Sequence, residues 1–265
     1  MQQACLTFLL ILFTAICSAQ KLSDKFEYKV TYKLTYKLDS TNLDESKSEY
    51  MILFAGDELS KFSSRAVTLS KTYEISGNSG YTSPQVVSEF HYRIIKEPET
   101  GKIFYTLKIP KMNDRFFYTE ELDQFEWQIL PVTKTIKDYK VQKAKTSFKG
   151  RDYIAWFTPE IPISEGPYKF NGLPGLILEI ADTEKHWNFE FFGLEELSPK
   201  VSYKTNLRMY AETERNELQD LWKQYRTDPM TYAGQAADMN SEVHKEYKRI
   251  FTEIEESKNN RLELK

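Results

Sequence analysis

The sequence lacks cysteine beyond its first nineteen residues. Cys5 and Cys17 are the two cysteines of the 265-residue chain, and residues 1–19 carry no charged side chain. From Gln20 onward the sequence therefore excludes a disulfide scaffold, a thiolate metal site and a cysteine nucleophile. The whole chain has 36 basic and 39 acidic side chains. This balance lacks the basic footprint that nucleic-acid binding requires, so no nucleic-acid partner is expected.

Long hydrophobic runs are equally scarce. The apolar run at residues 5–16 has twelve residues, whereas a membrane-spanning helix takes roughly twenty. Small residues follow at Cys17 and Ala19, which predicts a signal peptide cleaved after Ala19. A buried hydrophobic helix or a lipoprotein anchored at Cys17 are alternatives, and the bulky Ile16 disfavours the second. We expect residues 20–265 to be exported without a transmembrane segment, to the periplasm, the outer membrane or the cell exterior.

Motifs of known catalytic chemistry are missing as well. The sequence has no nucleophile elbow, zinc-binding HExxH, P-loop or dinucleotide-binding glycine motif. We therefore predict no catalytic residue, no metal and no cofactor. His186, near Asp182 and Glu184 at a hairpin mouth, is the one candidate for acid–base or metal chemistry, although a solvated turn is the favoured interpretation. Four carboxylates could act as an acid–base pair, but their spacing does not bring two of them together: Asp152, Glu160, Glu165 and Glu179.

Alternating apolar and polar residues are the clearest pattern that the sequence does contain. Residues 26–38 alternate in this way over thirteen positions, which predicts a long strand with one buried face. Similar patterns predict further strands at residues 49–55, 59–63, 88–96, 102–109, 115–119, 125–129, 139–148, 152–158, 176–180, 187–192 and 201–210.

Helical periodicity replaces this alternation near the end of the chain. Apolar side chains recur at helical spacing over residues 218–225 and again over residues 243–254. Asp228-Pro229 is expected to stop the first helix, and the charged residues 258–265 are expected to fray.

Strands followed by helices indicate an α+β fold. We predict a single domain over residues 20–265, strand-rich at 25–210 and helical at 211–257. Its sheet is expected to be antiparallel and strongly curved, or a half-barrel, with the two C-terminal amphipathic helices on its concave side.

Glycine and proline are concentrated in residues 150–175, which hold four of the ten glycines and four of the ten prolines. Such a stretch cannot be continuous sheet and must be an ordered loop. Its aromatic residues Trp156, Tyr168 and Phe170 are our candidates for ligand binding. The loop ends in the hexapeptide Gly172, Leu173, Pro174, Gly175, Leu176 and Ile177.

This hexapeptide and its flanks resemble the GLPGLI family of exported Gram-negative envelope proteins. The resemblance is strongest over residues 139–193 and implies an exported protein of unknown activity, without catalytic residues. Many family members have glycine before the position of Tyr139 and cysteine two residues after it. Here Asp138 and Val141 stand at those positions, which removes any thiol role implied by the family.

Three functions remain open from the sequence. The favoured one is a non-enzymatic envelope protein that binds an apolar ligand, a lipid or an outer-membrane protein. The alternatives are a periplasmic hydrolase that uses carboxylates or His186, and a structural or assembly factor of the envelope. Residues 134–151 contain seven basic side chains and one acidic side chain. This segment is either the wetted face of a strand or a contact with anionic lipid.

Overall fold

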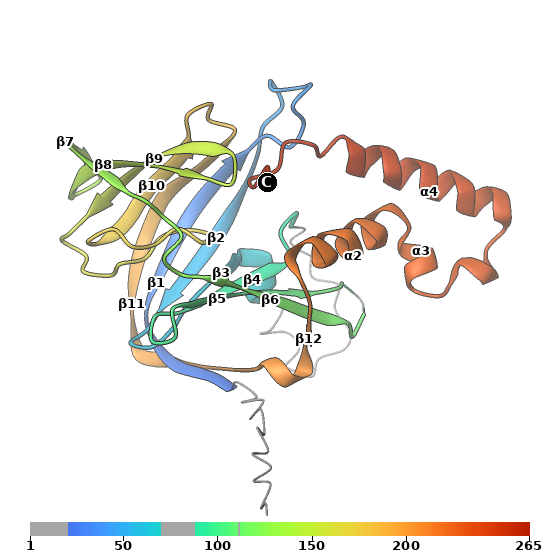
Figure 1. Ribbon diagram of the computed structural model, residues 1–265, viewed down its shortest axis with the longest axis horizontal. Helices are drawn as coiled ribbons and strands as arrows, with labels where there is room; N and C mark the ends of the chain where they lie inside the picture. The colour runs from blue at the N-terminus through green and yellow to red at the C-terminus, as the bar shows by residue number, and fades with distance from the viewer. Residues whose placement is uncertain (1–20, 70–87, 111) are drawn as a thin grey trace, which may run out of the picture.

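The computed structural model describes residues 21–69, 88–110 and 112–265, so the predicted signal peptide lies outside the described residues. Within this part of the chain, twelve strands form one hydrogen-bonded sheet (Figure 1). The strands are β1 (Lys21–Tyr36), β2 (Lys47–Ala55), β3 (Ser60–Ser64), β4 (Tyr92–Glu97), β5 (Lys102–Lys108), β6 (Arg115–Glu121), β7 (Gln128–Ile136), β8 (Tyr139–Phe148), β9 (Arg151–Thr158), β10 (Leu176–Asp182), β11 (Trp187–Asn206) and β12 (Ala211–Glu212).

The sheet is open at both ends. Its strand order is β12-β6-β5-β4-β3-β2-β1-β11-β10-β9-β8-β7, which leaves β12 and β7 as edges. Neighbouring strands are antiparallel except that β12 pairs in parallel with β6. After β11 the chain passes through the short 3-10 helix η1 (Leu207–Met209) and enters β12 beside β6. Because no hairpin joins β12 to β6, the two strands can run in parallel. The strand-dominated prediction is confirmed, and the sheet is mixed at this one edge.

The alternation that predicts the first strand also defines the buried face of the sheet. Val30, Tyr32 and Leu34 on β1 are fully buried, whereas Lys29 before them and Lys33 among them lie on the other side. We call the side with the buried residues the core face. β1 is central, because it pairs with β2 on one side and with β11 on the other.

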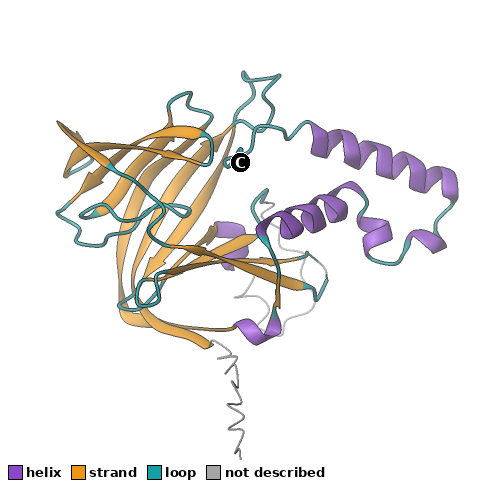
Figure 2. Cartoon of the chain, viewed as in Figure 1, coloured by secondary structure: helices purple, strands orange, loops and turns teal. Residues whose placement is uncertain are grey.

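The two predicted helices form but do not behave alike. α2 (Arg215–Thr227) buries Leu218 in a cluster with Leu107 and Ile109. After the short α3 (Pro229–Tyr232) and the 3-10 helix η2 (Ala236–Asp238), α4 (Ser241–Glu256) projects from the rest of the molecule (Figure 2). None of the helices in the described ranges is long and apolar enough to cross a membrane.

The apolar stripe of α4 is not packed against the sheet. Its four side chains are 41–47 % exposed: Val243, Tyr247, Ile250 and Ile254. The expectation that both helices cover the concave side is therefore wrong for α4. Leu262, within residues 258–265, joins the main apolar core instead. These residues were expected to fray, but Asn260 and Leu262 are buried at 5 % and 7 % exposure because buried cations of the body bind this segment.

The hexapeptide lies at the start of β10. Gly172 and Gly175 have φ values of +87° and +132°, which only glycine adopts without strain. A Cβ atom on Gly175 would lie 2.0 Å from the carbonyl oxygen of Thr158. Tyr32 in the centre of the sheet donates a hydrogen bond of 2.8 Å to the carbonyl of Ile177. The motif is thus fixed by backbone geometry and by the core.

Candidate ligand-binding cavity

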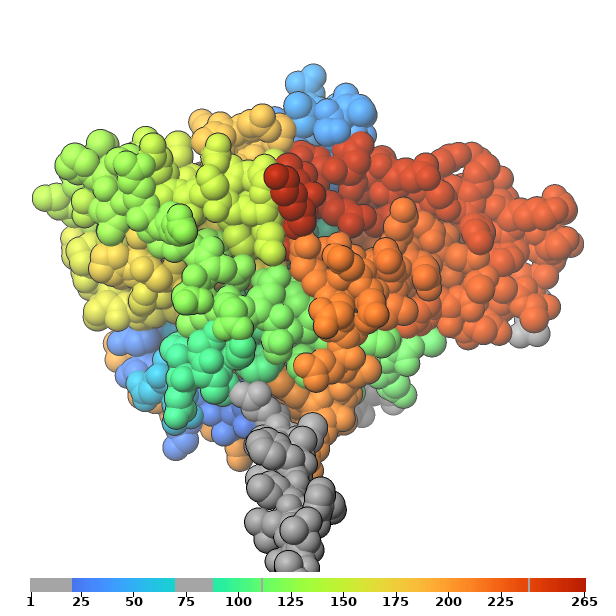
Figure 3. All heavy atoms as spheres, viewed as in Figure 1, coloured from blue at the N-terminus to red at the C-terminus, as the bar shows by residue number. Residues whose placement is uncertain are grey.

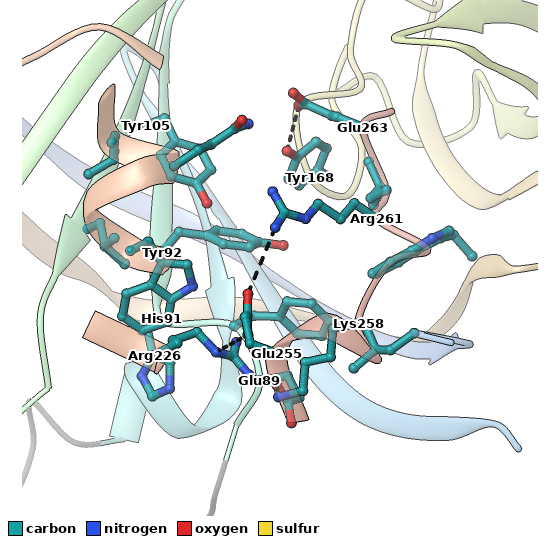
Figure 4. A pocket seen from close by; sticks show the side chains of 18 of the residues that line it. Glu89, His91, Tyr92, Tyr105, Tyr168, Arg226, Glu255, Lys258, Arg261 and Glu263 are labelled. Atoms are coloured by element: carbon teal, nitrogen blue, oxygen red, sulfur yellow. Dashed lines mark hydrogen bonds and ion pairs between the residues drawn. The ribbon is translucent and has the colours of Figure 1, made fainter. Parts of the chain in front are cut away.

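A cavity of about 180 Å³ lies between the core face, α2 and residues 258–265, which we call the C-terminal segment (Figure 4). The sheet supplies its walls from β4, β5 and β6, and the loop before β10 supplies Tyr168. Eight of the nineteen residues that line it have aromatic rings, namely Phe90, His91, Tyr92, Tyr105, Tyr118, Tyr168, Trp187 and Trp222. This is the kind of concave, mainly apolar space in which small molecules bind.

The tyrosines form a stacked wall across three strands. Tyr105 and Tyr118 face each other in the register of β5 and β6, with ring centroids 4.8 Å apart and nearly parallel planes. Tyr92 lies 5.1 Å from Tyr105 and 5.7 Å from Tyr168, centroid to centroid. Burial raises the pKa of Tyr92, Tyr118 and Tyr168 well above the ordinary value of 10.0. The wall is therefore uncharged at neutral pH.

Ion pairs close one side of the cavity. Arg226 of α2 lies 3.0 Å from Glu89 and 2.8 Å from Glu255 of α4, measured between nitrogen and oxygen. Lys258 adds a contact of 2.8 Å to Glu89. Burial lowers the pKa of the neighbouring His91, so this imidazole is neutral at pH 7. Four chain segments are thus joined at the cavity mouth by paired charges.

A second charged group lies where the cavity meets the C-terminal segment. The carboxylate of Glu263 accepts hydrogen bonds from Tyr168 and Arg215 at 2.6 and 2.7 Å, and it pairs with Lys169 at 2.6 Å. Burial alone would raise the pKa of Glu263, but Lys169 and its other partners outweigh burial and lower it. Lys169 is fully buried and also contacts Glu120 at 2.7 Å.

One donor on the cavity wall has no partner. Trp187 is 3 % exposed, and its indole nitrogen Nε1 makes no hydrogen bond within the described part of the chain. Its ring stacks on Tyr36 and tilts against Phe90. Buried donors are almost always satisfied, so this nitrogen, which has almost no accessible surface, is an exception among the described residues.

The three aromatic residues singled out in the sequence do not lie together. Tyr168 lines the cavity, and Phe170 lies next to it, 6.4 Å away between centroids, but is fully buried. Trp156 lies on the opposite face of β9, where the ammonium groups of Lys134 and Lys143 are 4.3 and 5.8 Å from its ring centroid. The structure brings Tyr168 and Phe170 together and places Trp156 apart.

His186 and the candidate carboxylates lie away from the cavity. His186 Nδ1 is 3.3 Å from Glu184 Oε2, and the ligand atoms of Asp182, Glu184 and His186 all lie within 4.8 Å of one another. Asp182 is already bound, since Arg151 contacts it at 3.0 Å and the Trp187 amide donates to it. This guanidinium opposes a cation at the site.

The four candidate carboxylates have separate partners. Asp152 accepts from Ser147, Glu160 from the Lys140 amide, Glu165 from Lys96 and Glu179 from Lys134. None of them lines the cavity. No sequence pattern points to the cavity residues Glu89, Arg226, Glu255 and Glu263, because these residues come together only through the fold.

Comparison with known proteins finds a family profile that matches part of the chain, and a similar fold. Residues 147–179 match the sequence profile of a family described as a protein of unknown function (Porph_ging). The matched segment includes the whole hexapeptide. No curated protein matches the chain. An uncharacterised family is therefore supported over this segment, in agreement with the resemblance found in the sequence.

Solved structures of PNGF-II, in space groups C2 and P21, are similar in fold. Their TM-scores are 0.55 and 0.56 at 13 % identity, and each alignment covers 76 % of this chain. The chain spans about one third of the length of those proteins, 33 % and 34 %. A likeness at this identity concerns the fold and says nothing of activity.

Proposed function

We propose that the chain is an exported envelope protein of the GLPGLI family that binds a small apolar ligand in the aromatic cavity. The observation that carries this proposal is a cavity with an uncharged tyrosine wall, made up of Tyr92, Tyr105, Tyr118 and Tyr168. The hexapeptide and the family match over residues 147–179 support the family. The apolar run and small residues before Gln20 support export and cleavage.

The size of the cavity limits the ligand. An apolar protein cavity of about 150 Å³ takes up benzene, and this one measures about 180 Å³. The part of the ligand that enters is therefore about one or two small rings or a short acyl chain.

We also propose that the sheet is strongly curved around this cavity. In strand order, β6 and β9 are eight steps apart, so a flat sheet would separate them by roughly 38 Å. Yet Lys149, in the turn before β9, lies 4.0 Å from Glu120 of β6. The short distance supports a half-barrel shape with one concave side.

Hydrolysis has less support. His186 and the candidate carboxylates are bound to separate partners and do not line the cavity. A role in envelope assembly has one specific observation in its favour, the exposed apolar stripe of α4. Native mass spectrometry of protein purified from its own envelope separates ligand carriage from assembly. A bound small molecule supports the first function, and a bound protein supports the second.

The cavity itself is tested by calorimetry with 1-naphthol, a small aromatic probe. We expect saturable binding to the unmodified chain and its loss in Leu218→Trp, which fills the cavity from α2. The matched control is Ile250→Trp on the exposed stripe of α4, which should bind the probe unchanged. Equal binding by both variants, or none by the unmodified chain, would refute the proposal.

A further inference from the structure

The C-terminal segment is bound to the body as a peptide is bound in a receptor. Its backbone amides at Asn260 and Leu264 donate to the carbonyls of Leu38 and Lys149 at 2.8 and 2.9 Å. Its carbonyl at Arg261 accepts from Arg151 at 2.7 Å, and the next carbonyl accepts from Tyr153 at 3.1 Å. The main chain of residues 260–264 is therefore held from both sides.

Three side chains of this segment supply selectivity. The side-chain amide of Asn260 donates to the Lys37 carbonyl at 2.8 Å and accepts from Arg151 at 2.5 Å. Both its nitrogen and its oxygen are therefore bound by the groove that holds the segment. Leu262 enters the main apolar core at 7 % exposure. Glu263 makes the three charged and polar contacts described above. Asn259, which precedes these anchors, and Arg261, which lies between the first two, are exposed.

The residues that bind the segment have partners of their own in the body. Arg151 pairs with Asp182 at 3.0 Å, and Lys169 pairs with Glu120 at 2.7 Å. If the segment left, each buried cation would still be paired with a carboxylate of the body. A binding site can persist when empty only if its buried charges stay paired in this way. The groove is preorganised by contacts that do not involve its occupant.

The element that carries the segment can move without disturbing the sheet. α4 leaves its apolar stripe exposed, and its charged contacts are with α2 and the residue after it: Glu255 pairs with Arg226, and His244 with Asp228. In Figure 3 the last residues of the chain lie at the surface, between α2 and the turn of β8 and β9. Release would therefore expose the groove directly to solvent.

We propose that this groove is a binding site for an extended peptide of a partner protein, with residues 258–264 as its resident competitor. The partner segment offers an asparagine, a leucine two positions later and a carboxylate directly after it. The recognition groups of the groove, Arg151, Lys169 and Arg215, do not line the cavity of the proposed ligand function. The resident segment, however, forms part of that cavity's wall through Lys258, Arg261, Leu262 and Glu263.

The test uses a fluorescent peptide with the sequence of residues 257–265 and the full-length chain. The double variant Leu262→Ala/Glu263→Ala weakens the resident segment, and its circular dichroism establishes that the sheet has formed. Fluorescence anisotropy should show binding at least about tenfold tighter than to the unmodified chain. A peptide with Glu263→Lys should bind about ten- to hundredfold more weakly, since it loses charged hydrogen bonds.

Several outcomes would overturn the proposal. One is a folded double variant that does not bind the peptide, and another is equal binding of the Glu263→Lys or a scrambled peptide. If the double variant does not fold, the full-length Glu263→Gln chain replaces it, because the amide keeps the size of the carboxylate. Because Leu262 and Glu263 also line the cavity, the 1-naphthol measurement is made on the unmodified chain, where the segment is in place. Failure of one proposal is then distinguishable from failure of the other.

Discussion

Lys96 is fully buried beneath the loop that precedes the hexapeptide, and its replacement by methionine tests what holds that loop. Its ammonium group donates to Glu165 at 2.5 Å and to the carbonyls of Gly166 and Phe170 at 3.2 and 2.8 Å. Glu165 is 8 % exposed and also accepts from Ser60. Lys96→Met therefore leaves a buried carboxylate without its cation.

The expected loss in the free energy of unfolding is about 3–5 kcal/mol, the usual cost of removing one partner of a buried ion pair. The matched control is Lys102→Met, whose pair with Glu121 has side chains 40 % and 65 % exposed. That change should cost about 0–1 kcal/mol, because water already solvates both charges. Urea unfolding followed by circular dichroism gives both values from the midpoint and slope.

A second variant separates the unpaired charge from lost packing. Lys96→Met/Glu165→Gln removes both charges, and the glutamine still accepts from Ser60. We expect the double variant to regain part of the stability that Lys96→Met loses. If Lys96→Met costs less than about 1 kcal/mol, or if the double variant is less stable than Lys96→Met, the ion pair does not anchor the loop as argued.

Three further predictions concern the motif, the C-terminal segment and the helices. Gly175→Ala should destabilise the chain by more than about 3 kcal/mol, because its Cβ would overlap backbone at a φ of +132°. Gly193→Ala, where a Cβ meets nothing within 4 Å, should stay within about 1 kcal/mol in the same urea assay. The pKa of Glu263 in the folded state lies below its ordinary value of 4.5. Its contribution to the free energy of unfolding is therefore complete above pH 4.5 and is lost as the pH falls through the lowered pKa. Urea titrations at a series of acidic pH values should show this loss in the unmodified chain and a smaller one in Glu263→Gln. Leu218→Ala should cost about 2–5 kcal/mol and Ile250→Ser within about 0.5 kcal/mol, and thermal unfolding that ranked them otherwise would contradict the packing described for α2 and α4.

Local patterns predict the elements of this fold well. The alternation in residues 26–38 anticipates β1, because the face of a strand is set by the parity of its own residues. The helical spacing after residue 215 anticipates α2 and α4. Residues 187–192 and 201–210 suggest two strands, whereas β11 continues through Gly193 with a register shift.

The candidate site is harder to predict, because its geometry depends on distant residues. In β9 every residue from Tyr153 to Phe157 is apolar, so parity does not reveal that Trp156 faces away from the cavity. The charged composition of residues 258–265 suggests a frayed end. Its burial requires the cations Arg151, Lys169 and Arg215, which bind it in the fold. The sequence alone does not reveal that these three residues converge on the segment.

The central position of β1 has a consequence for how the molecule is made. Its hydrogen-bonded neighbour β11 lies far along the chain, as the pair of Lys29 and Glu195, 166 positions apart, illustrates. Contacts of such separation form late, since loop-closure entropy must be overcome first. A chain still being synthesised therefore carries β1 with one edge unpaired and its apolar side chains uncovered. Such an edge invites wrong pairing, so this protein is expected to need protection until its last third has emerged.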